Sequence, residues 1–172
     1  MRILVVNANT SQLVTDKVSA QARASASAGT EIVAVTGRFG ARVIGSRAEH
    51  AIGAHSTLAL VSEHAPGCDA VLIAVSYDTG LQAARELLPI PVVGMTEAAL
   101  LSACMLGGRM GVITFGLRVR PLYEELAAGY GLSSRIAGWR TQESQAAYGS
   151  GAHDELDQLI VAIANDLVDN DG

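Results

Sequence analysis

The chain has 172 residues, of which 49% are hydrophobic and 17% are charged, and its net charge is -5. This composition can bury a core and excludes a disordered chain, while the length suits one large α/β domain or two small lobes. Acidic residues are in excess and Lys and Arg form no cluster, so nucleic acid and anionic membranes are not expected partners. The chain opens on a strand pattern and no apolar run approaches the ~20 residues that cross a bilayer, which predicts a cytoplasmic protein.

Apolar runs typical of buried parallel strands alternate with amphipathic helical stretches along the whole chain. The expected strands lie at about 2–7, 31–36, 70–76, 91–94, 110–115 and 134–139. The expected helices lie at about 11–27, 47–64, 79–88, 96–106, 118–130 and 153–169. This order predicts an α/β fold with parallel sheets.

The second half of the chain resembles the first. The strands that begin at Arg2 and Arg109 both end in a polar loop before a helix. We therefore predict two similar lobes with parallel sheets, residues 1–95 and residues 96–172. In the first lobe a third strand follows, and its counterpart in the second lobe would lie beyond Gly172. The favoured interpretation is a second lobe truncated at its C-terminus, and the alternative is a fold that closes without this strand.

Three polar loops follow expected strands, at the carboxyl ends where open α/β sheets bind their ligands. The residues predicted to bind substrate are Asn9, Thr10 and Ser11 in the first loop, Asp78, Thr79 and Gly80 in the second, and Thr114, Phe115 and Arg118 in the third. Short polar side chains and backbone N–H groups at helix starts can bind a carboxylate, imide or carbonyl oxygen. The alternative for each loop is an ordinary helix cap or turn. Two facing lobes would bring all three loops to one cleft.

Side chains that usually carry catalysis give weaker signals. Ser76 lies in the second loop, but a serine needs an adjacent base and no histidine is evidently placed to supply one. Three histidines share one expected helix without the i, i+4 spacing of a metal-binding pair, which favours a solvated face. They are His50, His55 and His64. Cys68 and Cys104 have no CxxC spacing and are expected to be reduced. Because GxGxxG, P-loop, HExxH and GxSxG motifs are absent from the sequence, we predict a site without cofactor or metal.

Four segments of the chain match motifs of one known family. They are Asn7-Ala8-Asn9-Thr10-Ser11, similar to N-P-N-T-S; Ile73-Ala74-Val75-Ser76-Tyr77-Asp78-Thr79-Gly80-Leu81, similar to I-A-C-x-x-D-x-G-L; Pro91–Ala99; and Gly111–Thr114. In this order and spacing they resemble the hydantoin and allantoin racemases of the Asp/Glu racemase superfamily. The resemblance covers nearly the whole chain.

The resemblance implies two lobes with pseudo-twofold symmetry, a homo-oligomer, and a small-molecule substrate held between two cysteines. One cysteine removes the proton from a carbon α to a carbonyl and the other returns it on the opposite face. The first family cysteine falls on Val75, beside Ser76, and the second would lie beyond Gly172. A cofactor-independent racemase acting on a hydantoin, allantoin or amino-acid-like substrate is therefore expected, with Ser76 as the candidate catalytic residue. Two alternatives stay open, a one-thiol decarboxylase or isomerase of the same superfamily and a non-catalytic small-molecule binder.

Overall fold

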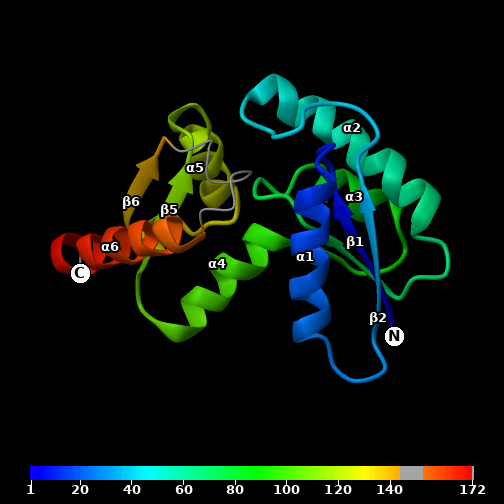
Figure 1. Cartoon of the computed structure of the whole chain (residues 1–172), viewed down its shortest axis with the longest axis horizontal. Coiled ribbons are helices and arrows are strands. Elements are labelled where there is room, and N and C mark those ends of the chain that lie inside the picture. Colours follow the sequence, from blue (N-terminus) through cyan, green and yellow to red (C-terminus); the bar gives the residue numbers. More distant parts are fainter. Residues whose placement is uncertain (144–152, 172) are drawn as a thin grey trace. The chain divides into compact units, whose positions relative to one another are not determined.

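The structure, a computed structural model, describes residues 1–143 and 153–171, with side chains from Asp157 onwards in the last helix. The chain divides into two compact units, Met1–Ala98 and Ala99–Gly172, and each contains one parallel sheet (Figure 1). The predicted division into lobes of residues 1–95 and 96–172 stays a prediction. No described helix is both long enough and apolar enough to cross a membrane.

The first unit contains four parallel strands in the order β2-β1-β3-β4. The strands are β1 (Arg2–Asn7), β2 (Glu31–Thr36), β3 (Ala70–Ile73) and β4 (Val92–Gly94). The helices are α1 (Gln12–Ser25), α2 (Arg47–His64), α3 (Leu81–Leu87) and α4 (Met95–Leu106), of which α4 continues into the second unit. Helix α1 packs on β1 and β2, and α2 packs on β1 and α3. The predicted α/β order with parallel strands is confirmed.

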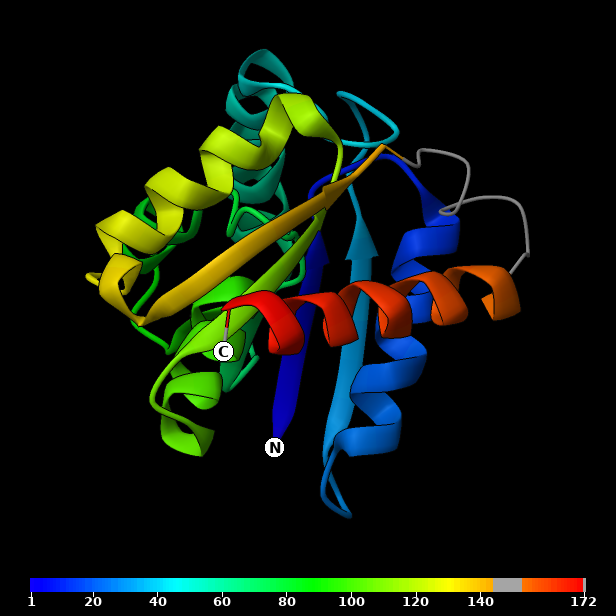
Figure 2. The same cartoon turned by 90° about the vertical axis from the view of Figure 1, so that its left-hand side faces the viewer.

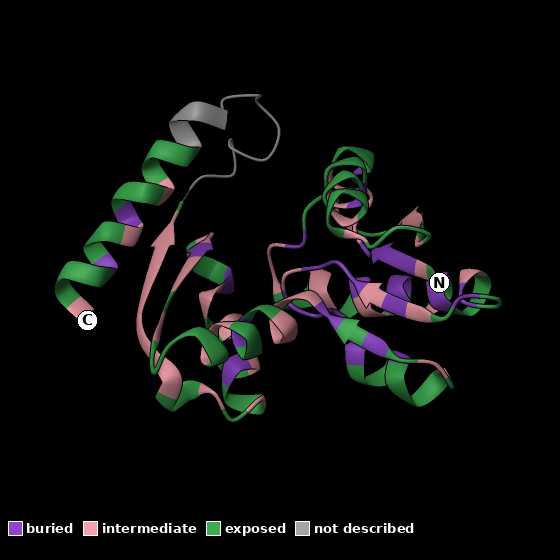
Figure 3. Ribbon diagram, turned by 90° about the horizontal axis from the view of Figure 1, so that it is seen from below, coloured by how far each residue is buried: buried purple, intermediate pink, exposed green. Residues whose placement is uncertain are grey.

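The core of the first unit lies around its two central strands, β1 and β3, which consist largely of aliphatic residues. Leu4, Val6 and Ile73 are fully buried, and Figure 3 shows buried segments gathered in this sheet. Burial of one such side chain stabilises the fold by roughly 1.5–3 kcal/mol. Strand β3 ends at Ile73, three residues earlier than expected, because the chain then turns and the Asp78 N–H donates to the Val75 carbonyl at 2.8 Å.

The second unit has a smaller sheet of two parallel strands, β5 (Met110–Phe115) and β6 (Ile136–Gln142), which Figure 2 shows side by side. Its helices are α5 (Arg120–Gly129) and α6 (His153–Asp171), and short 3₁₀ turns precede α5 and β6. Helix α6 contacts both strands. It approaches closely because Gly111 has no side chain; a Cβ there would lie 2.8 Å from Leu167 Cδ1. All residues of β6 are only half-buried (Figure 3).

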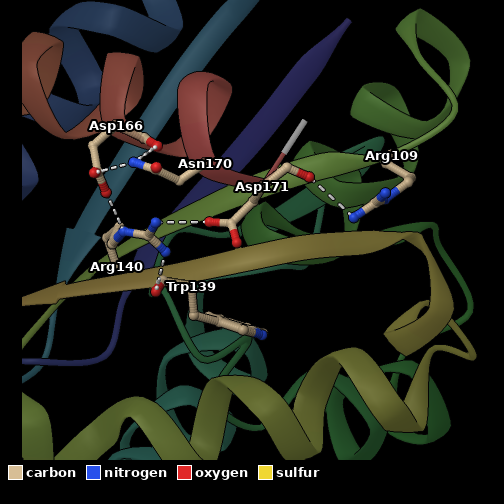
Figure 4. A network of polar contacts seen from close by, with 6 residues as sticks. All are labelled: Arg109, Trp139, Arg140, Asp166, Asn170 and Asp171. Atoms are coloured by element: carbon tan, nitrogen blue, oxygen red, sulfur yellow. Dashed lines mark hydrogen bonds and ion pairs between the residues drawn. The ribbon is translucent and has the colours of Figure 1, made fainter.

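A polar network fastens α6 to the two strands (Figure 4). Arg140 on β6 forms ion pairs with Asp166 and, at 2.7 Å, with Asp171. Arg109, just before β5, donates to the Asp171 carbonyl at 3.1 Å. The hydrogen bond to Asp166 is the main reason why the pKa of Arg140 is raised, and the same contact lowers the pKa of Asp166. The network is partly exposed, so it fixes the orientation of α6 more than it adds stability.

Candidate functional site

Two of the three predicted loops leave the first sheet side by side. Strands β1 and β3 are hydrogen-bonded neighbours with Val6 opposite Ile73, and the Ala74 N–H donates to the Val6 carbonyl at 2.8 Å. The loop after β1 and the loop after β3 therefore begin at adjacent strand ends. This is the edge where open α/β sheets bind ligands.

The first loop is held by the side chain of Asn9. Its Oδ1 accepts hydrogen bonds from Asn7 Nδ2 and from the Ser11 N–H, both at 2.9 Å. Ser11 precedes α1 without a side-chain capping bond, while the Thr10 N–H donates to the Ala41 carbonyl at 3.1 Å. Asn9 Nδ2 has no hydrogen-bond partner among residues 1–143 and 153–171. Because the acceptor is used within the loop, Asn9 offers its N–H groups to a carbonyl or carboxylate oxygen.

Asp78 in the second loop caps α4, the helix that begins after β4. Its side chain is 4% exposed, and its two oxygens accept the backbone N–H groups of Thr96 at 2.9 Å and Glu97 at 2.8 Å. These N–H groups belong to the first turn of α4, where the helix itself supplies no acceptor. The residue keeps an uncommon positive φ of 47° to reach them. We therefore infer a structural role for Asp78, and the direct substrate contact expected from the sequence stays a prediction.

Thr79 is also turned inward. It is 0% exposed, its hydroxyl lies 3.1 Å from His50 Nδ1, and its carbonyl accepts a hydrogen bond from the Thr57 hydroxyl at 2.8 Å. These contacts hold the loop against α2, and they leave no part of the Thr79 side chain exposed. We therefore infer a structural role for Thr79, and its predicted contact with substrate stays a prediction.

His50 corrects the expectation that the histidines form a solvated face. Its imidazole is half-buried, and its ring lies edge-on to the Tyr77 ring with 6.0 Å between centroids. His55, on the same helix, is exposed and lies 5.0 Å from the ring of Phe39. The start of a helix in a βαβ unit lies at the carboxyl edge of the sheet, and this position of His50 within residues 47–64 was the signal that could have found it.

Val75 and Ser76 occupy the part of the loop where the family cysteine is expected. Val75 is 6% exposed and apolar. The half-buried Ser76 accepts a hydrogen bond from the Thr96 hydroxyl at its carbonyl, at 2.6 Å. Its own hydroxyl has no partner within the described ranges, so no base contacts it there. Gly80 follows with φ of 80°, and a Cβ at this position would lie 3.0 Å from Thr57 Cβ.

The third predicted loop belongs to the second unit. Thr114 is buried near the end of β5, with its hydroxyl 2.9 Å from that of Thr141 on β6. Phe115 is the last residue of β5, and Arg118 is an exposed residue of the 3₁₀ turn that follows. Arg118 has no ion-pair or hydrogen-bond partner among the residues that the structure describes. The convergence of this third loop with the first two loops on one cleft stays a prediction.

Neither cysteine is a residue of these three loops. Cys68 is buried and its sulfur donates to the His64 carbonyl at 3.5 Å, while Cys104 is a half-buried residue of α4. Both thiols are free. Over the described ranges, no three His, Cys, Asp or Glu side chains gather as they would around a metal ion.

The His50 imidazole makes the stability of the protein depend on pH. Burial, and secondarily the charge of Arg47, lowers the pKa of His50 below its ordinary value. In the unfolded chain a histidine titrates near ~6.5, so the unfolded state binds more protons as the pH falls through that value. Stability should then decrease below about pH 6.5 until the folded-state pKa is passed. Between about pH 8 and about pH 5, the free energy of unfolding measured in urea should decrease less for His50→Asn than for the parent. Equal decreases in the two proteins would contradict the assignment of His50 as the group responsible.

Residues 3–172 match the family model of the Asp/Glu/hydantoin racemases. The chain belongs to this family. It is 34% identical to a hydantoin racemase of Pseudomonas sp. (strain NS671) over 142 residues, which cover 82% of the chain and 57% of that relative. It is 31% identical to a hydantoin racemase of Paenarthrobacter aurescens, over 100% of the chain and 74% of that relative. This racemase-family chain also matches the structure of an allantoin racemase from Klebsiella pneumoniae with a TM-score of 0.93 and 33% identity, covering 100% of the chain and 71% of that structure.

The resemblance read from the four sequence segments is thereby confirmed at the level of family and fold. The chain spans little more than half the length of the Pseudomonas relative. Its site differs from the family motif at Val75, where an apolar side chain stands in place of the expected thiol.

Proposed function

We propose that this protein is a cofactor-independent racemase-type isomerase whose substrate is a hydantoin, allantoin or amino-acid-like molecule. The reaction is the removal and return of a proton on a carbon α to a carbonyl. Membership of the racemase family supports the proposal, together with the two polar loops at the carboxyl edge of the first sheet.

The observation that carries the proposal is the arrangement around Asn9. Its Oδ1 is committed to the loop, so the amide orientation is fixed and Nδ2 keeps N–H groups for a ligand. The loop also ends at the start of the 14-residue helix α1, where backbone N–H groups favour negative charge. When the substrate loses its α proton, charge develops on the carbonyl oxygen, and fixed donors stabilise that charge without having to reorganise.

The proton-transfer part of the site is weaker than the oxygen-binding part. Val75 has no proton to exchange, Ser76 has no contacting base among the described residues, and the carboxylate of Asp78 caps α4. We therefore propose that substrate binds to these loops, and that the α proton is exchanged no faster than in buffer while Val75 occupies the thiol position.

Asn9→Asp tests the oxygen-binding role with little disturbance to the loop. The aspartate keeps an Oδ1 acceptor for Asn7 and Ser11, but it loses the Nδ2 donor and adds a negative charge. We expect the affinity for a 5-substituted hydantoin to fall by about 1–3 kcal/mol, the usual cost of an unpaired polar group. Calorimetric titration of the parent and the variant measures this difference, and urea unfolding should show nearly equal stability.

Gln21→Glu is the matched control, because it introduces the same change of charge at an exposed residue of α1 that lies away from the start of the helix. It should leave the affinity within about twofold, a difference below 0.5 kcal/mol. A parent protein that binds no hydantoin, allantoin or amino-acid-like ligand would contradict the proposed function. Binding without any exchange of the α proton, even with a thiol restored at position 75, would instead support the non-catalytic binder.

A further inference from the structure

A single imidazole contacts two side chains of the loop Val75–Gly80. His50 Nδ1 lies 3.1 Å from the Thr79 hydroxyl, and the His50 ring is edge-on to Tyr77. Both loop side chains are buried, whereas His50 is half-buried and lies on another element, α2. The histidine therefore lies between solvent and the buried side of the loop.

The same face of α2 fixes Thr79 in place. Gly53, one turn after His50, leaves just enough room for Thr79; a Cβ there would lie 3.2 Å from Thr79 Cγ2 and 2.7 Å from Ile44 Cδ1. A further turn along the helix, Thr57 donates to the Thr79 carbonyl at 2.8 Å. Residues at i, i+3 and i+7 share one helix face, so the side chain and the carbonyl of Thr79 are both held by α2.

The protonation state of His50 decides how the Thr79 hydroxyl is satisfied. A neutral imidazole can accept the hydroxyl proton at Nδ1, whereas an imidazolium can only donate. Donation would leave the proton of a fully buried hydroxyl without an acceptor among the described residues, and buried polar groups are costly to leave unpaired. The loop conformation seen in the structure is therefore matched to neutral His50.

We propose that neutral His50 is a positioning residue for the loop Val75–Gly80, and that its protonation releases Thr79 and weakens substrate binding at that loop. The second half of this statement rests on the proposed function, because it requires the loop to bind substrate. His50 acts through Thr79 and Tyr77 and has no assigned contact with the reacting atoms.

The charges around His50 favour the neutral form. Arg47 lies on the same helix and opposes a second positive charge. The nearest carboxylates in the sequence are engaged elsewhere, since Glu49 accepts from the turn before α2 and Asp78 accepts from the first turn of α4. Tyr77 is the titratable side chain of the loop that faces the imidazole. The lowered pKa of His50 agrees with this environment.

Nuclear magnetic resonance of the full chain tests the positioning role without a ligand. In the parent, the amide signals of residues 75–80 should shift with the same midpoint as the His50 ring. His50→Asn retains an acceptor near the position of Nδ1 and cannot be protonated, so its loop signals should stay at the high-pH positions throughout. His50→Ala removes the acceptor, and its loop signals should stay displaced at every pH. His55→Asn, at the exposed histidine of the same helix, is the control and should keep the parent titration.

Affinity provides the second measurement. Binding of a 5-substituted hydantoin to the parent should fall roughly tenfold as His50 becomes protonated, and binding to His50→Asn should stay constant. Loop signals that do not move while His50 titrates would overturn the proposal, as would the same pH dependence of affinity in His50→Asn and the parent. If no ligand binds at any pH, the proposed function fails, and the amide titration alone decides the role of His50.

Discussion

Asp78→Ala should destabilise the protein by about 2–4 kcal/mol, because it leaves two N–H groups in the half-buried first turn of α4 without acceptors. The carboxylate reaches the Thr96 and Glu97 N–H groups from a loop 18 and 19 residues earlier, so no local group replaces it. Urea unfolding followed by circular dichroism measures the difference in unfolding free energy. Asp78→Asn should lose a large part of the same stability, since its NH₂ group would face one of the two N–H donors.

Asp16→Ala provides the control for loss of an aspartate at the surface. Asp16 is exposed on α1, and among the described residues its carboxylate accepts a hydrogen bond only from the side chain of Gln12. Its replacement should change stability by no more than about 0.5 kcal/mol. An equally small effect of Asp78→Ala would show that the first turn of α4 is satisfied by other means and that the structural role of Asp78 is wrong.

Val75→Cys should have the largest effect on activity. A missing general acid or base costs roughly 10²–10⁴-fold in rate, so we expect the parent to racemise a 5-substituted hydantoin no faster than buffer does. A thiol at position 75 titrates near ~8.5 when unperturbed, which gives a usable fraction of thiolate at neutral pH. The variant should accelerate exchange of the α proton for deuterium by about 10²-fold or more over the parent.

Two rates measured in D₂O define how the variant works. If deuterium is incorporated faster than optical rotation is lost, one group acts on one face of the carbon. If the two rates are equal, a second group acts on the other face. Val75→Ser is the control, because its hydroxyl is far less acidic than a thiol and should give no acceleration. Racemisation by the parent clearly above buffer would mean that Ser76, Tyr77 or Asp78 is a working base and that the thiol assignment is mistaken.

The order of helices and strands could be predicted from the sequence because each follows from local periodicity. Helix α2 has the predicted bounds, since its cap Ser46 and its apolar face are encoded within one stretch. The end of β3 could not be predicted in the same way. Its last expected residues enter a turn that is held from α4, and nothing within residues 70–76 encodes that contact.

The roles of individual loop residues were harder to predict for the same reason. Asn9 is held by neighbours two residues away, and its contact with substrate stays a prediction. The partner of the Thr79 hydroxyl is instead His50, 29 residues earlier in the chain. The carboxylate of Asp78 has its partner in α4, a helix that begins after β4. A polar residue near a strand end can contact substrate or support the backbone, and only the fold distinguishes these two uses.

The close approach of Asp78 to Gly94 constrains how this sequence can evolve. A Cβ at Gly94 would lie 2.5 Å from Asp78 Cγ and 2.7 Å from Leu81 Cδ2, so both side chains would have to shift to admit it. Loss of the aspartate alone would leave the contact with Leu81. A library that randomises position 94 while Asp78 and Leu81 are kept should therefore recover glycine, and larger residues should appear there only when both neighbours are varied as well.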